Sequence, residues 1–379
     1  MKYLPENEFS ELKSIPLEDL KVLIYTKVNA IKLDPYIQQI IGYLQKYKII
    51  WYVSDEVVIK LKEELSEANE RPSDEENTEV SSIDFDTLEI YCDKFQNKIN
   101  RVITLGGDGT VVQAIKLFCK DKCPSMITFS EESLGYLCCF ESDNYEEVLY
   151  HSLIKGAQAD LDTEEIEHKQ EKDCLGKPYI ETRERVVLKI LFENEDKPVH
   201  SLFSPTKTKR PKFGSLYSLN QITIDRGSFN YLTNIECYLN GHMLTVIQGD
   251  GVIIATPTGS TAYNMSAGGS IVYNYVNSLL LTPIWPHSLS FRPLILPDDC
   301  LITLKASENS RSDFYSVSLD GEFKFELKRG EKIDITGCTC TIPFVTFTPN
   351  DDPMEEWWKR LNEKLHWNSR PIQKNFNNK

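Results

Sequence analysis

The sequence lacks a long hydrophobic run, because no apolar stretch in its 379 residues approaches the ~20 residues that a membrane-spanning helix needs. The first nine residues lack the charged-then-apolar pattern of a signal peptide. Basic residues are also scarce: 42 Lys and Arg stand against 57 Asp and Glu, which leaves a formal net charge of −15. Such a surface is unsuited to coating nucleic acid, whose phosphates require cationic partners. These absences favour a soluble cytoplasmic protein with neither a membrane nor a nucleic-acid partner.

Paired zinc-binding knuckles are absent as well, although the chain has ten cysteines. Three pairs are close in sequence: Cys119 with Cys123, Cys138 with Cys139, and Cys338 with Cys340. None of these spacings provides the two Cys-x-x-Cys pairs of a structural zinc site. We therefore expect reduced, mostly buried thiols and no metal site built from protein ligands alone.

The length suggests two domains, each large enough to bury its own core. Strand and helix patterns alternate in the first part of the chain, which is typical of an α/β domain. We expect strands at 21–26, 49–53 and 101–105, and helices at 34–47, 55–65 and 111–118. This domain is expected to comprise residues 1–155 together with a C-terminal helical segment, 353–379. That helix carries an apolar stripe of Trp357, Trp358, Leu361 and Leu365, which should pack on the first domain.

Residues 183–352 are expected to form a second, β-rich domain, because short strand patterns replace the alternation of strand and helix. We expect strands at 186–192, 219–224, 235–239, 243–247, 301–306, 315–319, 332–336 and 341–347. Asn240-Gly241 separates two of these strands and predicts a type I′ hairpin turn, since both central residues of that turn need positive φ.

Two acidic segments, 66–82 and 160–177, have few large apolar residues, and we expect both to be mobile surface insertions. With their immediate flanks, residues 63–86 carry a net charge of −9 and residues 160–181 carry −5, which together account for all but one unit of the net charge. The rest of the chain is therefore nearly neutral, and the acidity does not argue against a site for anionic ligands. A short basic loop at 205–212 is interpreted as a solvated insertion.

The run Gly106-Gly107-Asp108-Gly109-Thr110 lies between an expected strand and an expected helix. Glycines allow the backbone to approach a phosphate closely, and a helix N-terminus offers unpaired N–H groups and partial positive charge. Bound phosphates would repel Asp108, so its presence suggests contact with a metal or removal of a proton from a hydroxyl nucleophile. The alternative is a tight turn in which Asp108 caps the helix.

A second constellation begins with Gly249-Asp250-Gly251 and continues after a short strand with Thr256-Pro257-Thr258-Gly259-Ser260-Thr261-Ala262-Tyr263. Small hydroxyl residues around Pro and Gly predict a rigid loop with little side-chain bulk, followed by a short helix that ends at Gly268-Gly269. Such a loop can approach a ribose or a base, on which Tyr263 could stack; otherwise Tyr263 belongs to the core. Asp250 is either an acceptor for ligand hydroxyl or amine groups or simply a turn residue.

Five motifs occur in order: Gly-Gly-Asp-Gly-Thr at 106–110, Ser-Leu-Asn-Gln at 218–221, Gly-Asp-Gly at 249–251, Thr-Pro-Thr-Gly-Ser-Thr-Ala-Tyr at 256–263 and Pro-His-Ser-Leu-Ser-Phe-Arg-Pro at 286–293. Together they resemble the motif set of the ATP-dependent NAD kinases, especially the eukaryotic cytosolic type. The resemblance implies transfer of the ATP γ-phosphoryl group to the 2′-hydroxyl of the adenosine ribose of NAD, which yields NADP. It also implies a Rossmann-like N-terminal domain, a C-terminal β-sandwich domain, an active site in the cleft between them, and a homo-oligomer, either a dimer or a tetramer.

The resemblance further implies the roles of individual residues. Asp108 would be the general base, and Asp250 would bond the nicotinamide end of NAD, from a neighbouring subunit. The other residues implied to bind NAD or ATP are Gly106, Gly107, Gly109, Thr110, Asn220, Gln221, Gln248, Thr261, Ala262, Tyr263, Ser266 and Glu322. Mg²⁺ would be carried by the ATP phosphates rather than by a protein cage.

Two residues depart from the family pattern. Gln221 stands where the family usually has Glu, and Glu132 where it tends to have Gly. They motivate an alternative function, a catalytically weak NAD-binding regulatory protein. A lipid kinase, which could share the first motif, is disfavoured because the 258–263 loop suits a dinucleotide.

Overall fold

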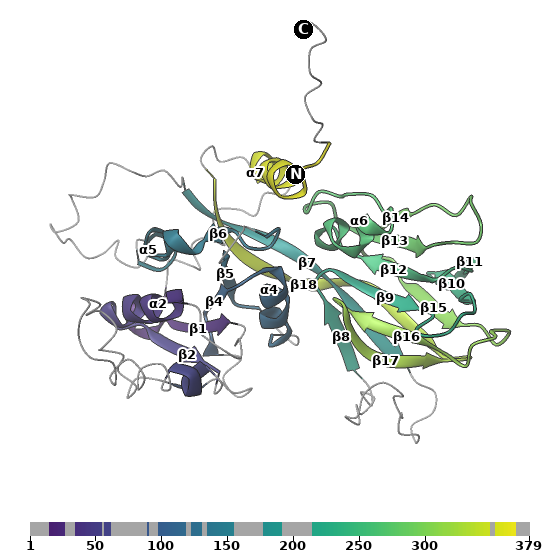
Figure 1. Cartoon of the computed structure of the whole chain (residues 1–379), viewed down its shortest axis with the longest axis horizontal. Coiled ribbons are helices and arrows are strands. Elements are labelled where there is room, and N and C mark those ends of the chain that lie inside the picture. The colour runs from purple at the N-terminus through teal and green to yellow at the C-terminus, as the bar shows by residue number, and fades with distance from the viewer. Residues whose placement is uncertain are drawn as a thin grey trace, which may run out of the picture. The chain divides into compact units, whose positions relative to one another are not determined.

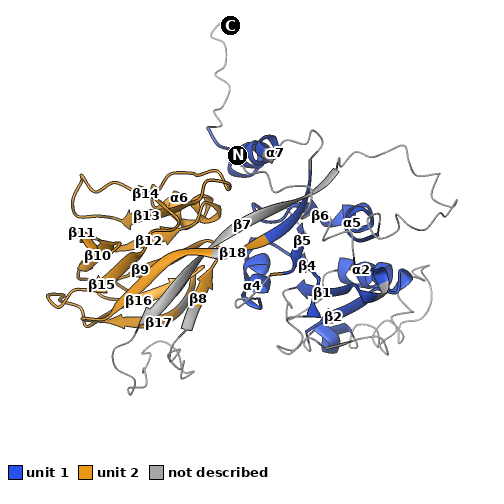
Figure 2. Ribbon diagram, turned by 180° about the vertical axis from the view of Figure 1, so that it is seen from behind, with its two compact units in different colours: residues 1–118, 124–181, 343–379 blue, residues 119–123, 182–342 orange. Residues whose placement is uncertain are grey.

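The structure is a computed structural model that describes residues 15–26, 35–54, 57–61, 89–90, 98–118, 123–130, 135–154, 177–191, 214–348 and 353–368. The chain divides into two compact units, shown in blue and orange in Figure 2. Unit 1 comprises residues 1–118, 124–181 and 343–379, and unit 2 comprises 119–123 and 182–342. The acidic segment 66–82, all of the acidic segment 160–177 except Lys177, the basic loop 205–212 and Glu132 lie outside the described residues; Lys177 is the first residue of a strand.

Unit 1 contains a parallel β-sheet. Its strands are β1 (Lys21–Thr26), β2 (Ile50–Val53), β3 (Glu89–Ile90), β4 (Arg101–Leu105), β5 (Ser125–Ser130) and β6 (Phe140–Glu141), joined by the end of β18 (Lys332–Thr348). They follow the order β18-β5-β4-β1-β2-β3, with β6 also paired to β5. All of these pairs are parallel. The central strands β4 and β5 are buried along their whole length, as expected where both faces of such a sheet are covered.

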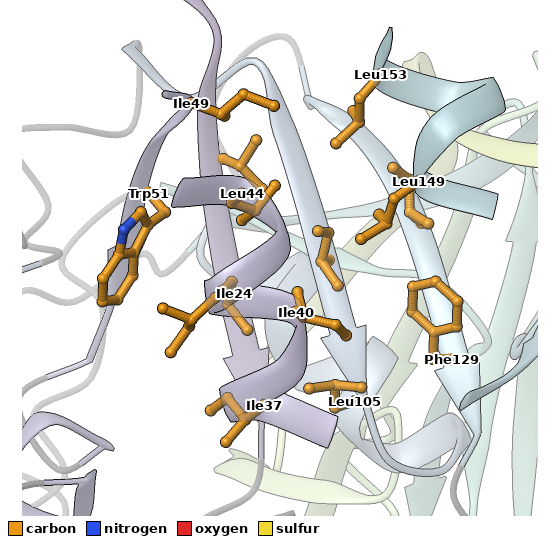
Figure 3. Packing of buried hydrophobic residues seen from close by; sticks show 14 of the residues in the cluster. Ile24, Ile37, Ile40, Leu44, Ile49, Trp51, Leu105, Phe129, Leu149 and Leu153 are labelled. Atoms are coloured by element: carbon orange, nitrogen blue, oxygen red, sulfur yellow. The ribbon is translucent and has the colours of Figure 1, made fainter. Parts of the chain in front are cut away.

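Helices pack on this sheet and complete the core of unit 1. They are η1 (Leu17–Asp19), α2 (Pro35–Lys46), α4 (Asp108–Lys116), η5 (Ser142–Asn144), α5 (Tyr145–Leu149), the π-helical turn Tyr150–Ile154 and α7 (Pro353–Leu365). Figure 3 shows that Ile37, Ile40 and Leu44 of α2 point toward the strands, as their spacing of three and four residues requires. At the C-terminus, Leu361 of α7 is buried, and Arg360 donates from Nη2 to Thr346 Oγ1 of β18 at 2.9 Å.

Unit 2 consists of two antiparallel sheets. One has the order β14-β13-β12-β9-β16-β17, and the other contains β11-β10-β15 and the first part of β18. The strand bounds are β7 (Lys177–Leu191), β8 (Gly214–Ser218), β9 (Gln221–Asp225), β10 (Ile235–Leu239), β11 (His242–Ile247), β12 (Gly251–Ala255), β13 (Ser278–Ile284), β14 (Leu294–Pro297), β15 (Ile302–Ala306), β16 (Phe314–Leu319) and β17 (Glu322–Lys328). Strand β7 pairs with β8 and with β18.

The core of unit 2 lies between these sheets. Ile222 and Val317 from one sheet share a buried cluster with Leu304 and Ile333 from the other. Alternating buried and half-buried residues along β15 and β16 show that one face of each strand is turned inward. Unit 2 is therefore a β-sandwich, as the sequence resemblance implies. Two short helices, η8 (Thr258–Thr261) and α6 (Tyr263–Ser266), follow β12 (Figure 1).

Several expected element bounds are corrected by the structure. Helix α4 begins at Asp108 rather than at residue 111, because Gly107 is already extended and the N–H of Thr110 bonds to the Gly107 carbonyl at 2.9 Å. Strand β9 begins at Gln221 rather than 219, because the two preceding residues form a turn. The expected strands 332–336 and 341–347 are one strand, β18. Among the described residues, no helix is long and apolar enough to cross a membrane.

Candidate active site

The glycine-rich turn of unit 1 connects the carboxyl end of β4 to the first turn of α4. Gly106 has φ +134°, and a Cβ atom there would lie 2.6 Å from Thr110 Oγ1, so this position accepts only glycine. Gly107 is the N-cap, with no bond from a side chain. Thr110 N–H already bonds to Gly107 O, whereas N–H groups earlier in the turn precede the first helical hydrogen bond and can bind an anion.

Asp108 is the first residue of α4, and its carboxylate is held by the backbone of a neighbouring segment. Oδ1 accepts from the N–H groups of Leu137 at 2.9 Å and Cys138 at 3.3 Å, and Oδ2 accepts from Tyr136 at 2.9 Å. The alternative that Asp108 caps its own helix is therefore wrong. A carboxylate at this end of a helix is favoured by the helix dipole, and the three N–H donors fix the orientation of its side chain.

The distribution of donors leaves Asp108 with more acceptor capacity on one oxygen than on the other. A carboxylate has about four lone-pair sites, two on each oxygen. Among the described residues, Oδ1 accepts two of the three N–H groups and Oδ2 accepts one, so Oδ2 is the oxygen with more capacity for another donor. Gly135 makes this arrangement possible, because a Cβ atom at that position would overlap the carboxylate. Sequence analysis did not identify Gly135, which lies five residues before Phe140 in a short segment without a clear strand or helix pattern.

Cys138 contributes its side chain as well as its N–H group. Its buried thiol donates from Sγ to the carbonyl oxygen of Gly106 at 3.2 Å. Burial raises the pKa of the Cys138 thiol, and the negative charge of Asp108 raises it further. The thiol therefore remains protonated and acts as a donor, which links the 135–138 segment to the glycine-rich turn at two points.

In unit 2, the expected dinucleotide residues Asn220 and Gln221 adjoin the hydroxyl-rich loop that follows β12. Thr256 donates from its N–H group to Asn220 O at 2.9 Å and from Oγ1 to Leu219 O at 2.6 Å. A Cβ atom at Gly259 would lie 2.5 Å from the carbonyl carbon of Asn220, so only glycine allows the two segments to pack this closely. The structure therefore brings the second and fourth motifs together.

Gln221 is 7% exposed, and its Oε1 has no hydrogen-bond partner among the residues that the structure describes. A buried acceptor without a partner is costly, typically ~1–3 kcal/mol. Such a group is most easily explained by a donor from outside the chain, such as a ligand hydroxyl or amine. A nearby acidic residue that sequence analysis missed, Asp320, accepts from the backbone of the same turn. The signal for it was present, because Asp320-Gly321 follows an expected strand and is typical of a hairpin turn.

The loop between β12 and α6 is supported by one buried amide side chain. Asn264 donates from Nδ2 to Ser260 O at 3.2 Å and Ser270 O at 3.1 Å, and its Oδ1 accepts from Thr282 Oγ1 at 2.6 Å. Gly268 has φ +83°, which confirms the expected end of the short helix at this glycine. These bonds rigidify the loop that carries Thr261, Ala262 and Tyr263.

Tyr263 is 44% exposed, so the alternative that it is a core residue is wrong. Partial burial raises the pKa of Tyr263, and the negative charges of Asp225 and Asp250 raise it further. Its ring is thus available to a ligand and lies within electrostatic range of the Gly249-Asp250-Gly251 turn. Ser266, three residues later, is also exposed.

Asp250 forms an ion pair that was not anticipated from the sequence. Arg226 Nε lies 3.1 Å from Oδ1 and Arg226 Nη2 lies 3.3 Å from Oδ2, with both side chains about one-third exposed. The turn is fixed further by the bond from Asp250 N–H to Ile284 O at 2.8 Å. Asp250 therefore has a defined orientation but retains access to solvent.

The remaining expected residues are exposed. Gln248 accepts at its carbonyl oxygen from the N–H of His287 at 2.9 Å, which joins the third and fifth motifs. Glu322 begins β17, and its Oε2 lies 3.0 Å from Lys324 Nζ. Arg292, in the fifth motif, is exposed.

Comparisons with known proteins agree with this arrangement of motifs. The profile of the ATP-NAD kinase N-terminal domain matches residues 22–156, and that of the ATP-NAD kinase C-terminal domain matches residues 219–347. The ATP-NADH kinase YEF1 of Saccharomyces cerevisiae is 37% identical over 287 residues, which are 76% of this chain and 52% of that protein. The NAD(+) kinase of the same yeast is 36% identical over 279 residues, or 73% of this chain and 46% of that protein. The chain thus spans about half the length of these relatives.

Two solved structures are similar in fold. The crystal structure of yeast NADH kinase complexed with NADH has a TM-score of 0.73 at 28% identity and covers 96% of this chain and 91% of that one. An NAD kinase from Archaeoglobus fulgidus in complex with ATP has a TM-score of 0.56 at 18% identity, covers 92% of this chain and 99% of that one, and shows the shared fold alone. Both family profiles match in chain order, and the motif residues lie within them except Ser218, which directly precedes the second match. The chain therefore belongs to the ATP-NAD kinase family.

Proposed function

We propose that this chain is an ATP-dependent NAD kinase, which transfers the γ-phosphoryl group of ATP to the 2′-hydroxyl of the adenosine ribose of NAD and produces NADP and ADP. The observation that carries the proposal is the Asp108 carboxylate, fixed by three backbone N–H groups at the start of α4. A fixed carboxylate beside a glycine-rich helix N-terminus provides both a base and a place for phosphate oxygens.

Asp108 acts as the general base of the proposed reaction. A secondary hydroxyl is a weak nucleophile, so its proton must be accepted as the new bond to phosphorus forms. Oδ2 of Asp108, the oxygen with more capacity for another donor, takes this proton. The ribose oxygen bonds to the γ-phosphorus, the bond from that phosphorus to the bridging oxygen breaks, and ADP leaves.

The turn formed by Gly106, Gly107, Gly109 and Thr110 is assigned to the phosphates. Because Gly106 N–H bonds to Phe129 O at 3.1 Å and Thr110 N–H bonds to Gly107 O at 2.9 Å, the N–H groups assigned to phosphate oxygens are those of Gly107 and Gly109. Mg²⁺ accompanies ATP in this proposal, because polyphosphate oxygens are the hard ligands that Mg²⁺ prefers, and it offsets the charge that develops during transfer. The close fit of Gly106 against Thr110 supports this role, since it keeps side-chain bulk away from the turn.

Unit 2 provides the proposed dinucleotide contacts through Asn220, Gln221, Thr261, Ala262, Tyr263 and Ser266, with Gln248 and Glu322 at the margin. Three features support this assignment. The Gln221 side chain is buried and has an acceptor without a partner among the described residues, the Tyr263 ring is exposed, and Asn264 makes the loop that carries Tyr263 rigid.

We also propose a homo-oligomer, a dimer or a tetramer, in which Asp250 serves the nicotinamide end of NAD bound to a neighbouring subunit. Thr233 donates to Gly249 O from both N and Oγ1, so the exposed Tyr231 and Leu232 lie near the Asp250 turn, as does the exposed Trp285. An apolar rim around a charged turn is suited to burial against a second copy.

The edge strand β11 extends this apolar surface. Strand β11 is at the end of its sheet (Figure 2), and Met243, Leu244 and Val246 on it are all exposed, although successive residues of a strand point to opposite faces. Sedimentation analysis tests the assembly. Replacing Leu244 with Lys should shift the protein toward the monomer and lower activity, whereas a monomeric wild-type chain with full activity would contradict this proposal.

The central test is an assay of the purified chain with NAD or NADH as acceptor, ATP or polyphosphate as donor, and Mg²⁺. We expect NADP or NADPH with ATP. Binding of NAD by calorimetry without formation of NADP would instead favour the regulatory alternative suggested by Gln221 and Glu132. A cytoplasmic location is part of the proposal and is supported by Cys138, Cys237 and Cys300, which are free thiols as expected in a reducing compartment.

A further inference from the structure

The turn of the β16–β17 hairpin presents a carboxylate to a segment about a hundred residues earlier in the chain. Asp320 and Gly321 both have positive φ, +49° and +78°, which is the geometry of a type I′ turn. Oδ1 of Asp320 accepts from Asn220 N–H at 2.8 Å and Gln221 N–H at 3.1 Å, and Oδ2 accepts from Leu219 N–H at 3.0 Å. Ser218 Oγ lies 2.5 Å from Oδ1.

These donors form a concave set of backbone N–H groups of the kind that binds anions in proteins. The anion here is a side chain of the protein itself. Hydrogen bonds to an ionised acceptor are about twice as strong as those between neutral groups. The single carboxylate of Asp320 therefore determines the conformation of the whole 218–221 turn. The backbone adds a further bond, from Asp320 N–H to Gln221 O at 2.9 Å.

The opposite side of the same turn faces the hydroxyl-rich loop. The N–H groups of Leu219 and Asn220 bond to Asp320, while their carbonyl oxygens accept from Thr256. Gly259 packs against Asn220 without space for a side chain. Two elements assigned to dinucleotide recognition are thus aligned by one peptide segment, and that segment is held by Asp320.

We propose that Asp320 is a positioning residue for dinucleotide binding, which sets the conformation of Asn220 and Gln221 and the placement of the Thr256–Gly259 loop. Its own carboxylate is engaged by the backbone and is assigned no contact with the substrate. This inference rests on the proposed function, since it specifies how the NAD-binding residues are held. It predicts that loss of the carboxylate impairs NAD binding while ATP binding is retained.

Asp320→Asn is the primary variant. It removes the negative charge and replaces one carboxylate oxygen with an amide NH₂. That NH₂ group then faces a backbone N–H group, and two donors cannot form a hydrogen bond. Each lost charge-assisted bond corresponds to ~10–100-fold in an equilibrium constant. By calorimetry we expect the Kd for NAD to rise about 10–100-fold on this scale, with the Kd for ATP and Mg²⁺ changed less than about 2-fold. In turnover assays, KM for NAD should rise more than kcat falls.

Asp313→Asn is the matched control, because Asp313 and Asp320 flank the two ends of β16. Its carboxylate is exposed and pairs with Arg329 at 2.8 Å, and an exposed ion pair contributes little. Asp313→Asn should leave both Kd values unchanged. Ser218→Ala provides a milder change at the same carboxylate, since it removes one donor and leaves the backbone bonds, and it should raise the Kd for NAD about 3–10-fold.

The outcomes separate this inference from the function on which it rests. A wild-type chain that neither binds NAD nor forms NADP would contradict the proposed function. If the wild-type chain is active and a folded Asp320→Asn variant has an unchanged Kd for NAD, the positioning role is overturned. If Asp320→Asn does not fold, the Ser218→Ala variant is the test. A Ser218→Ala protein that is folded by circular dichroism and has a raised Kd for NAD alone supports the positioning role. An equal loss of NAD and ATP binding in that variant overturns it.

Discussion

Gly135 and Asp108 occupy adjoining space: a Cβ atom on Gly135 would lie 2.6 Å from the carboxyl carbon of Asp108. This is well inside the distance at which two carbon atoms can pack. The carboxylate can therefore reach the three N–H groups of the 136–138 segment only because residue 135 has no side chain.

Replacing Gly135 with Ala should displace the Asp108 carboxylate and lower kcat by roughly 10²-fold or more, because a misplaced general base loses most of its contribution. The measurement is steady-state formation of NADP. Gly42→Ala is the matched control, because Gly42 is an exposed position in α2 with no atom within 4 Å of an added Cβ. It should keep full activity and gain ~0.5–1 kcal/mol of stability. Equal activity in the two variants would contradict the fit between Gly135 and Asp108.

Replacing Asp108 itself should lower turnover by about 10² to 10⁴-fold, as loss of a general base does. Both Asp108→Ala and Asp108→Asn remove the base, but the Asn variant also places donor N–H groups against the N–H groups of Tyr136, Leu137 and Cys138. It should therefore be the less stable of the two in thermal unfolding. Calorimetry should show that NAD still binds to Asp108→Ala. Wild-type turnover in that variant would remove Asp108 from the mechanism.

Gln221→Glu restores the residue that the family usually has but places a carboxylate at a buried position. Burial raises the pKa of a carboxyl group above its unfolded value. The carboxyl group at position 221 then loses its proton at a lower pH in the unfolded chain than in the folded chain. The stability of the variant should therefore match that of wild type near pH 4 and fall below it as the pH rises toward 8. Thermal unfolding at the two pH values measures this difference.

The matched control for this charge is Gln113→Glu, on the exposed face of α4. Its unfolding temperature should follow that of wild type at both pH values. A Gln221→Glu variant as stable as wild type at pH 8 would show that the 221 side chain is solvated or paired, contrary to its burial.

Deletion of residues 66–82 should leave NAD kinase activity largely intact. This segment holds much of the excess negative charge and none of the motif residues. The assay compares kcat and KM for NAD and ATP between the deletion and the full chain. A loss of activity beyond about 10-fold, in a folded protein, would assign the segment a role in catalysis or binding.

Much of the fold could be predicted because local patterns and final structure agree. The apolar residues of α2 recur at helical spacing, and β1, β4 and β10 have the expected bounds. The Asn240-Gly241 turn has positive φ at both residues, as its sequence requires. At these sites the local sequence pattern alone was sufficient to predict the helix, strand or turn that forms.

Other elements could not be predicted from local patterns. Strand β13 contains Pro283, a residue that disfavours strands with neighbours on both sides. Pro283 pairs with Val252 of β12 but lies beyond Leu281, the last residue of β13 that pairs with β14, so it occupies an edge position of the sheet. The start of α4 was misplaced because glycines obscure a helix, whereas Asp108 favours its first turn. The bonds around Asp108, Asp250 and Asp320 connect segments that are distant in the sequence, so no periodicity could reveal them.

Strand β18 has a consequence for the order of synthesis. Its first residues pair with β15 in unit 2, and its later part pairs with β5 in unit 1, where α7 then packs. The ribosome therefore starts unit 1 first but completes it only after all of unit 2 has been made, an interval of tens of seconds at ~5–20 residues per second. Until then the β5 edge is unpaired at Met126. A nascent chain that stalls before residue 343 would present that edge to chaperones and proteases.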